Sequence, residues 1–287
     1  MTDNQLAKQK SKQNRGFSHR GSQSGKKRKS VELGGDRTLG CRYELKYHIT
    51  ESTAVAIARY VGQFLEMDRY SKLQRKGDYP IVSLYLDSAN LQLCRESLRG
   101  YKNRFKLRIR SYTDEPEYPR FFEIKRRLNT VIMKSRARVM DRDVPALLAG
   151  LPLPPQEFKA DVDTINQFQL YTDSIQAGPA VLVRYMRQAF EGDSNNRVRV
   201  TFDRELAYKI THKPEVRLGG PGWQRNPFTR NGVVLEIKFT GHFPAWLSGM
   251  VKYFNLRQRS ISKYASSIED SCLLGFCAPQ MESVEYG

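Results

Sequence analysis

The feature that most constrains this chain is a series of short segments in which charged and apolar residues alternate. In residues 42–48, the charged side chains fall on one face of an extended chain and Tyr43, Leu45 and Tyr47 fall on the other. A period of two predicts a β-strand that is buried on one face only. The same period recurs in five more segments: 104–110, 122–127, 132–138, 197–203 and 233–240.

Three further segments read as strands, which gives about nine in all, and helical spacing of apolar residues is less frequent. The chain therefore predicts an α+β fold in which one antiparallel sheet system has helices packed outside it. The added strands are 80–87, 180–190 and 205–211, the expected helices are 50–65, 89–98, 245–254 and 260–268, and the Pro- and Gly-rich segment 212–232 is expected to be a long loop.

The charged strand faces carry one sign of charge in excess. On the charged faces of the six alternating segments, fourteen Lys and Arg stand against four acidic residues. A solvated face of an open sheet also alternates, but it usually mixes both signs. We favour a closed antiparallel barrel of about eight strands, whose cations line the lumen and whose apolar outer surface is covered by helices. Such a lumen requires a polyanion, because unpaired cations held together are destabilising.

The whole chain has the same excess. Its 287 residues contain 48 Lys and Arg against 30 Asp and Glu, a net charge of +18. Residues 1–30 contain nine cations and one acid, a net of +8, which leaves +10 for the remaining residues. The low-complexity composition predicts a disordered basic tail over 1–38, a folded domain over 39–272 and a C-terminal tail over 273–287.

No segment is long and apolar enough for a membrane span, and the mean hydropathy is −0.60. The basic start lacks the apolar region of a secretory signal, so we expect a cytoplasmic protein, with peripheral association to a membrane or a partner protein left open. General nucleic-acid binding would explain the charge, but the chain has no dedicated motif with aromatic residues for base stacking, so no specific nucleic acid is expected as a partner.

The few acidic residues on the charged faces are candidates for metal ligands. Carboxylate oxygens bind Mg²⁺ and Mn²⁺, which phosphate-processing sites need. Glu236 is the first choice because it shares a face with Lys238. Glu44 and Glu123 are weaker candidates, since each could instead pair with a cation of a neighbouring strand.

The order of these segments resembles the triphosphate tunnel metalloenzymes of the CYTH-like superfamily, and more closely their VTC branch of polyphosphate polymerase domains. The resemblance covers about residues 40–270. No single motif is decisive, but eight in sequence are specific. The motifs are Arg42-Tyr-Glu-Leu-Lys-Tyr, Val82-Ser-Leu-Tyr-Leu-Asp, Lys106-Leu-Arg-Ile-Arg, Phe122-Glu-Ile-Lys, Val183-Arg-Tyr-Met-Arg-Gln-Ala-Phe, Arg199-Val-Thr-Phe-Asp-Arg, Leu235-Glu-Ile-Lys and Ser262-Lys-Tyr.

The resemblance implies a site in which cations hold a phosphate chain and a carboxylate holds a metal ion. Simple alternation places Arg184 and Arg187 on opposite faces, so we expect one of the two, with Arg187 favoured, to form an ion pair on the outer face unless a bulge re-aims it. Tyr185 is expected either at the tunnel mouth or in the core. The implied catalytic residues are Lys46, Arg108, Arg110, Lys125, Arg184, Arg199, Lys238 and Lys263, the implied substrate-binding residues are Lys134, Arg187, Ser262 and Tyr185, and the implied metal ligand is Glu236, with Glu44 and Glu123 behind it.

The implied activity is that of an ATP-polyphosphate phosphotransferase. It would transfer the terminal phosphoryl group of ATP to a growing inorganic polyphosphate chain, with Mn²⁺ or Mg²⁺ as cofactor. One alternative is a tripolyphosphate hydrolase of the same fold. Hydrolases of that kind usually begin with Glu-x-Glu-x-Lys, whereas this chain has a single acid at Glu44 and a Tyr or Arg in place of the other. A second alternative is a non-catalytic module that binds polyphosphate or inositol phosphates.

Overall fold

The alternating segments form one large antiparallel sheet in a computed structural model. The structure describes residues 42–129, 131–152, 159–192, 197–230 and 232–273. The chain divides into a unit of residues 1–36, which lies outside the described part, and a unit of residues 37–287. The predicted tails, 1–38 and 273–287, lie outside the described residues except for Leu273. The strands are β1 (Arg42–Ile49), β2 (Glu66–Met67), β3 (Tyr79–Asp87), β4 (Asn103–Ser111), β5 (Arg120–Leu128), β6 (Val131–Val139), β7 (Gly178–Glu191), β8 (Arg199–Ile210), β9 (Gln224–Arg225) and β10 (Val233–Thr240).

The expected helices are all present, and others occur between the strands. The first begins where the sequence places its cap: Thr50 Oγ1 accepts a hydrogen bond of 3.2 Å from the backbone N–H of Thr53. Among the described residues, no helix is long and apolar enough to cross a membrane. The helices are α1 (Glu51–Val61), α2 (Arg69–Lys72), α3 (Gln92–Leu98), the 3₁₀ helix η2 (Asp141–Asp143), α4 (Val144–Leu148), α5 (Lys159–Ser174), α6 (Pro227–Arg230), α7 (Ala245–Tyr253) and α8 (Lys263–Leu273).

The sheet is not closed, so the expectation of a closed barrel is wrong. Its strand order is β1-β10-β8-β7-β3-β4-β5-β6, with β2 and β9 attached to β7 and β8. In the described part of the chain, β1 and β6 form the two ends of this order and are not hydrogen-bonded to each other. The sheet is nevertheless strongly curled, because Lys125 Nζ of β5 lies 3.1 Å from Glu44 Oε2 of β1. The inner faces of the two halves therefore meet through side chains rather than through a backbone ladder.

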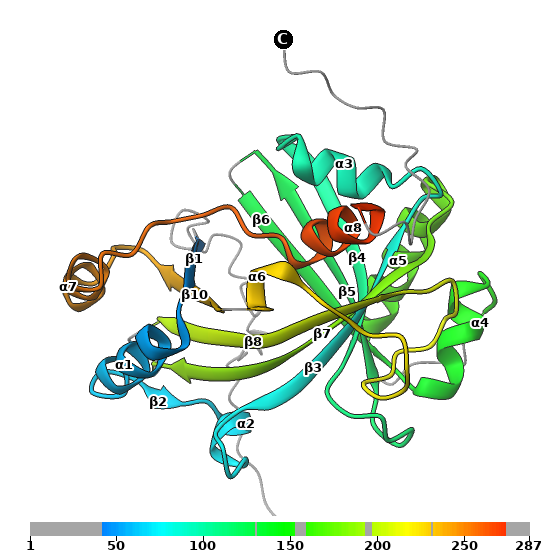
Figure 1. Ribbon diagram of the computed structural model, residues 1–287. Helices are drawn as coiled ribbons and strands as arrows, with labels where there is room; N and C mark the ends of the chain where they lie inside the picture. The colour runs from blue at the N-terminus through cyan, green and yellow to red at the C-terminus, as the bar shows by residue number, and fades with distance from the viewer. Residues whose placement is uncertain (1–41, 130, 153–158, 193–196, 231, 274–287) are drawn as a thin grey trace, which may run out of the picture. The chain divides into compact units, whose positions relative to one another are not determined.

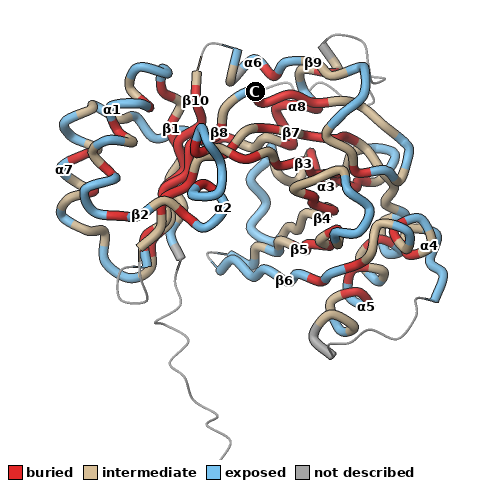
Figure 2. The backbone as a smooth tube through the Cα atoms, turned by 90° about the horizontal axis from the view of Figure 1, so that it is seen from below, coloured by how far each residue is buried: buried red, intermediate tan, exposed pale blue. Residues whose placement is uncertain are grey.

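Two apolar clusters cover the outer face of the sheet. One joins β1, β10 and β8 to α1 and α7, and Ile57, Leu235 and Leu247 are fully buried in it. The other joins β3, β4, β5 and β6 to α3, α4 and α5 around Phe122 and Phe168. Figure 1 shows α1 and α7 beside β1 and β10, with α4 and α5 at the other end of the sheet. Figure 2 shows that these outer helices are buried toward the sheet and exposed on their far sides.

A third cluster lies on the inner face, where α8 packs over β7, β3 and β8. Tyr264 of α8 stacks on Tyr85 of β3 with ring centroids 4.9 Å apart, and its hydroxyl donates to Asp87. Part of the inner face is thus filled by a helix, and the charged side chains occupy the rest. This helix also carries Lys263 into the charged region, as described below.

A bulge in β8 changes which residues of this long strand face inward before and after it. The sequence predicts two strands, 197–203 and 205–211, whereas the structure has one strand with a register shift opposite Tyr185. Glu205 there has φ +52°, the left-handed conformation typical of a bulge. Asp203 before the bulge and Tyr208 after it consequently both face inward, which simple alternation would forbid.

Candidate functional site

Glu236 of β10 lies at the centre of the first group of charged residues on the inner face. Its register partners are Lys46 on β1 and Thr201 on β8. Lys238 Nζ lies 2.8 Å from Glu236 Oε1, and Arg187 Nη2 lies 3.8 Å from Glu236 Oε2. Burial alone would raise the pKa of Glu236, but the surrounding cations, above all Lys238, hold it well below its usual range. The carboxylate is therefore fully ionised although it is buried.

Asp203 is the second carboxylate of this group, and it is not among the expected site residues. Arg187 Nε and Nη2 donate to its two carboxylate oxygens over 2.7 and 2.8 Å. Lys263 Nζ of α8 lies 2.7 Å from Asp203 Oδ2. Burial would raise the pKa of Asp203, but Arg187 and Lys263 outweigh it and lower the pKa to about 2. The alternation in 197–203 already placed Asp203 on the charged face, so the signal was present in the sequence.

Glu44 of β1 links the two halves of the sheet. Its two oxygens lie 2.9 Å from Lys46 Nζ and 3.1 Å from Lys125 Nζ. Burial and the nearby Glu236 raise the pKa of Glu44, but Lys46, Lys125 and Lys238 together lower it. Glu44 and Glu236 thus stand close to each other as two ionised carboxylates among shared cations.

A second group gathers four cations around one buried carboxylate, Glu123 of β5. Arg108 lies 2.6 Å and Arg110 3.8 Å from Glu123 Oε2, both from β4. Lys134 and Arg136 of β6 approach Glu123 Oε1 at 2.8 and 3.5 Å. The pKa of Glu123 is lowered despite its burial, chiefly by Arg108. The expected metal ligand Glu123 is therefore placed as the ion-pair partner of four cations.

Lys106 of β4 is a half-buried cation that is not among the expected site residues. Its Nζ donates to Ser262 Oγ over 2.9 Å. No ion pair joins Lys106 to a carboxylate in the described part of the chain. Burial and the neighbouring Lys46 and Lys125 lower the pKa of Lys106 to about 8. A half-buried ammonium that forms no ion pair within the described residues favours the approach of an anion. Its place in the alternation beside Arg108 and Arg110 could have identified it.

The β7 arginines lie opposite to the expected arrangement. Arg187 faces inward, whereas Arg184 lies on the outer face, where its Nη1 donates to the carbonyl of Leu218 over 2.5 Å and its guanidinium stacks 4.2 Å from the Trp223 ring. The bulge opposite Tyr185 lies in β8, so the alternation over residues 184–187 of β7 is preserved and no bulge brings Arg184 to the inner face. Tyr185 faces inward and contacts both Arg187 and Lys263 through its ring, at 5.2 and 5.0 Å.

Arg199 lies at one end of the inner face and is engaged by acids from two elements. Its Nη2 lies 2.6 Å from Asp68 Oδ2, next to α2, and its Nη1 contacts Glu191 of β7.

The structure therefore brings most of the expected site residues together. The inner face gathers Lys46, Arg108, Arg110, Lys125, Lys134, Tyr185, Arg187, Arg199, Lys238, Ser262, Lys263, Glu44, Glu123 and Glu236, and leaves Arg184 outside.

Glu44 and Glu236 are the residues that fit a divalent cation. No group of three or more His, Cys, Asp or Glu suited to a metal occurs in the described residues. Mg²⁺ and Mn²⁺ do not need one, because they are commonly held by one or two carboxylates together with substrate phosphates. The buried hydroxyl of Thr201, the register partner of Glu236, has no hydrogen-bond partner among the described residues. An unused oxygen beside an ionised carboxylate is consistent with a ligand at this position.

The chain belongs to the VTC domain family, whose model matches residues 41–271. The expected family is thereby confirmed. A comparison with curated proteins gives no match. Membership of this family supports an activity directed at polyphosphate or triphosphate.

Several solved structures are similar to this chain at low identity. The protein bh2851 from Bacillus halodurans is 15% identical, with 77% of this chain and 95% of that one covered and a TM-score of 0.43. For PH1819 from Pyrococcus horikoshii the values are 13%, 81%, 99% and 0.41. For HpAC1 from Hippeastrum they are 12%, 79%, 95% and 0.43. At these TM-scores the similarities carry no conclusion about function.

Proposed function

We propose that this protein is a polyphosphate polymerase that uses ATP as its phosphoryl donor. The observation that carries the proposal is the gathering of inward cations around a few shared carboxylates on the inner face of a VTC-family sheet. Such a surface suits a linear phosphate chain, whose charge repeats along its length. Arg108, Arg110 and Arg187 offer planar guanidinium groups that bind non-bridging phosphate oxygens.

The proposed reaction requires positioning and charge neutralisation rather than a covalent nucleophile. The terminal oxygen of the polyphosphate chain attacks the γ-phosphorus of ATP, the bond to the β,γ-bridging oxygen breaks, and ADP leaves with that oxygen. The Arg and Lys side chains hold donor and acceptor in line and neutralise the charge that develops on the leaving group. Glu44 and Glu236 would hold the divalent ion, which supplies further charge neutralisation at the transferring phosphate.

The single carboxylate of the first strand favours polymerase over hydrolase. The position two residues before Glu44 is Arg42 rather than a second glutamate. Activation of a water molecule by a metal depends on carboxylate ligands, so the loss of one weakens attack by water more than attack by a phosphate chain.

The direct test is incubation of the purified protein with ATP and either Mn²⁺ or Mg²⁺, with and without a short polyphosphate primer. We expect acid-labile polymer and ADP, with one ADP released for each phosphoryl group added to the polymer. Release of orthophosphate from tripolyphosphate without polymer would contradict the proposal and indicate a hydrolase. Binding of polyphosphate without any turnover would contradict it in favour of a non-catalytic module.

A further inference from the structure

A column of aromatic rings lies at the end of the inner face where β3 begins and β4 ends. Tyr70 of α2 and Tyr112, which follows β4, are stacked with centroids 5.9 Å apart and planes at 2°. Tyr79 of β3 lies 5.5 Å from Tyr70, and Phe121 of β5 lies 5.7 Å from Tyr112. Four rings from four separate segments therefore meet at one place.

This column is only partly a piece of the core. Tyr70 is 51% exposed, and Tyr112 and Phe121 are half-buried. Tyr70 and Phe121 belong to none of the three apolar clusters of buried and partly buried residues described above. Burial does not explain why a large ring such as Tyr70 is held parallel to the Tyr112 ring at the surface. A flat ligand that stacks on the exposed side of the Tyr70 ring would explain this arrangement.

A cation joins the column to the phosphate-binding groups. The Arg136 guanidinium carbon lies 3.7 Å from the Phe121 ring centroid, and Arg136 Nη2 donates to the Tyr112 hydroxyl over 3.1 Å. Its Nε also lies 3.5 Å from Glu123, and Phe121 is the register partner of Arg110. The aromatic rings are thus immediately next to the cluster formed by Arg108, Arg110 and Lys134 around Glu123.

We propose that Tyr70, Tyr112 and Phe121, together with Arg136, bind the nucleobase of ATP. This proposal rests on the proposed function, in which ATP is the donor. The base stacks on the exposed side of the ring column, and the triphosphate extends from it onto the neighbouring cations. An aromatic face and a phosphate cluster side by side match the two ends of a nucleoside triphosphate, one flat and one highly charged.

The site is expected to recognise a base by its face rather than by its edge. Stacking tolerates different bases because every base has a π-face. ATP and GTP should therefore bind with similar affinity, and both should bind more tightly than inorganic tripolyphosphate, which has no base. The difference in affinity between ATP and tripolyphosphate therefore separates the contribution of the ring column from that of the phosphate-binding cations.

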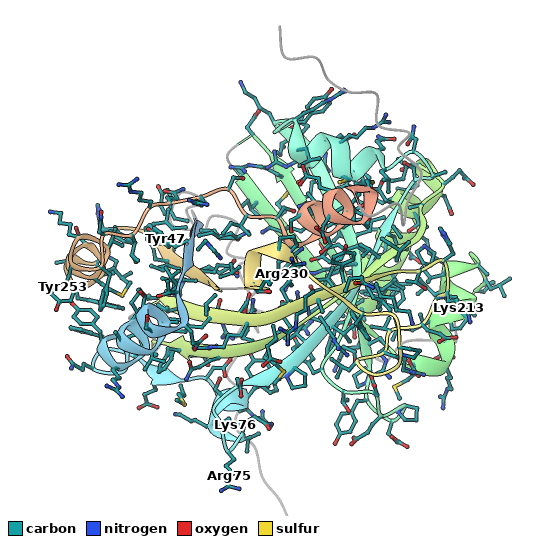
Figure 3. The ribbon with its side chains drawn as sticks, in the orientation of Figure 1. Tyr47, Arg75, Lys76, Lys213, Arg230 and Tyr253 are labelled. Carbon is teal, nitrogen blue, oxygen red and sulfur yellow. The ribbon has the colours of Figure 1, made fainter. Side chains whose placement is uncertain are left out.

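The test is calorimetric titration of ATP and of inorganic tripolyphosphate without divalent metal, so that neither ligand is turned over. In Tyr70→Ala we expect ATP to bind about 5- to 100-fold more weakly, the loss of one stacked ring, with tripolyphosphate unchanged. Tyr70→Trp should restore ATP binding. The matched control is Tyr253→Ala, because Tyr253 is 83% exposed and Figure 3 shows it projecting from α7, far along the chain from the ring column.

Two results would overturn the proposal: an equal change for ATP and tripolyphosphate in Tyr70→Ala, or no change for either. Because the measurement is binding, it separates this proposal from the proposed function. A protein that makes no polymer but loses ATP affinity selectively in Tyr70→Ala would retain the nucleobase site and lose the polymerase assignment. A protein that makes polymer but binds ATP equally well with and without Tyr70 would retain the polymerase assignment and lose the nucleobase site.

Discussion

At the scale of single residues, the inner face is defined by carboxylates that are outnumbered and shared. Glu123 alone is approached by four cations, and Asp203 by two. Isolated buried charges are costly, and an ion pair recovers that cost only with good geometry. The remaining positive charge is not compensated by the described residues. A bound phosphate chain would compensate it, so the electrostatic design of the face points to an anionic ligand.

The role of Glu236 gives the first prediction. Glu236→Gln should reduce polymer formation by on the order of 100-fold or more, because the amide is a poor ligand for a hard divalent ion. Binding of tripolyphosphate without metal should be kept or tightened, because the substitution removes a negative charge from the face. That binding measurement also shows whether the variant is folded. Glu66→Gln, at an exposed carboxylate, is the control, and full activity in Glu236→Gln would remove Glu236 from the metal site.

A second prediction concerns pH. Burial and nearby charges lower the pKa of Lys106 and of Lys134 to about 8, and Arg108 and Arg110 outweigh burial to lower the pKa of Tyr85 to about 8. Between pH 7 and pH 9 both lysines lose positive charge and the phenol becomes negative. All three changes weaken the binding of an anion, so the affinity for tripolyphosphate should fall about 10- to 100-fold over this range.

The same titration in Lys106→Arg provides the control for that pH effect. Arginine keeps its charge throughout the range, so the fall in affinity should become smaller, whereas any contribution from the ionisation of tripolyphosphate itself is the same in both proteins. An identical pH profile in Lys106→Arg and the unsubstituted protein would show that Lys106 does not contact the ligand.

At the scale of elements, the sequence predicted most strands well and failed where a strand bends. Alternation is a local property, so β1, β4, β5, β6 and β10 were recognisable from their residues. The bulge at Glu205 was interpreted as a break between two strands, and Arg184 was expected to face inward. The first error arises because the position of a bulge depends on the partner strand, and the second because alternation alone does not indicate which face of β7 is the inner one. The helix α5 was missed because its apolar residues, including Ile165 and Phe168, are spaced among many polar ones.

The bulge supplies a prediction of its own. Glu205 has φ +52°, a conformation that costs a β-branched residue most and glycine least. Glu205→Val should lower the free energy of unfolding by about 1–2 kcal/mol, whereas Glu205→Gly should leave it unchanged within about 1 kcal/mol. Urea denaturation of the two variants measures the difference. Equal stabilities would show that Glu205 does not hold the left-handed conformation in solution.

At the scale of the whole sheet, curling rather than closure brings the charged faces together. The sequence indicated which side of each strand is charged, and this information was sufficient to group most of the site. It could not indicate closure, because closure depends on strand number, tilt and stagger and not on the residues of any one strand. The pairing of Lys125 with Glu44 across the sheet is likewise invisible to local patterns, since 81 positions separate the two residues.

The curled sheet implies that its stability depends on the anion it holds. A ligand that binds the folded state alone stabilises it by about 2.7 kcal/mol at a concentration 100 times its Kd. For a folded unit of roughly 150–250 residues, that corresponds to a rise in Tm of about 5–10 °C. Thermal denaturation should show this rise with tripolyphosphate and a much smaller one with NaCl at equal ionic strength, because screening weakens repulsion without filling the site. Replacing Arg108 and Arg110 with Gln should reduce the tripolyphosphate effect, whereas replacing the outward-facing Arg184 should not. An equal rise with both salts would mean that the inward cations form no specific anion site.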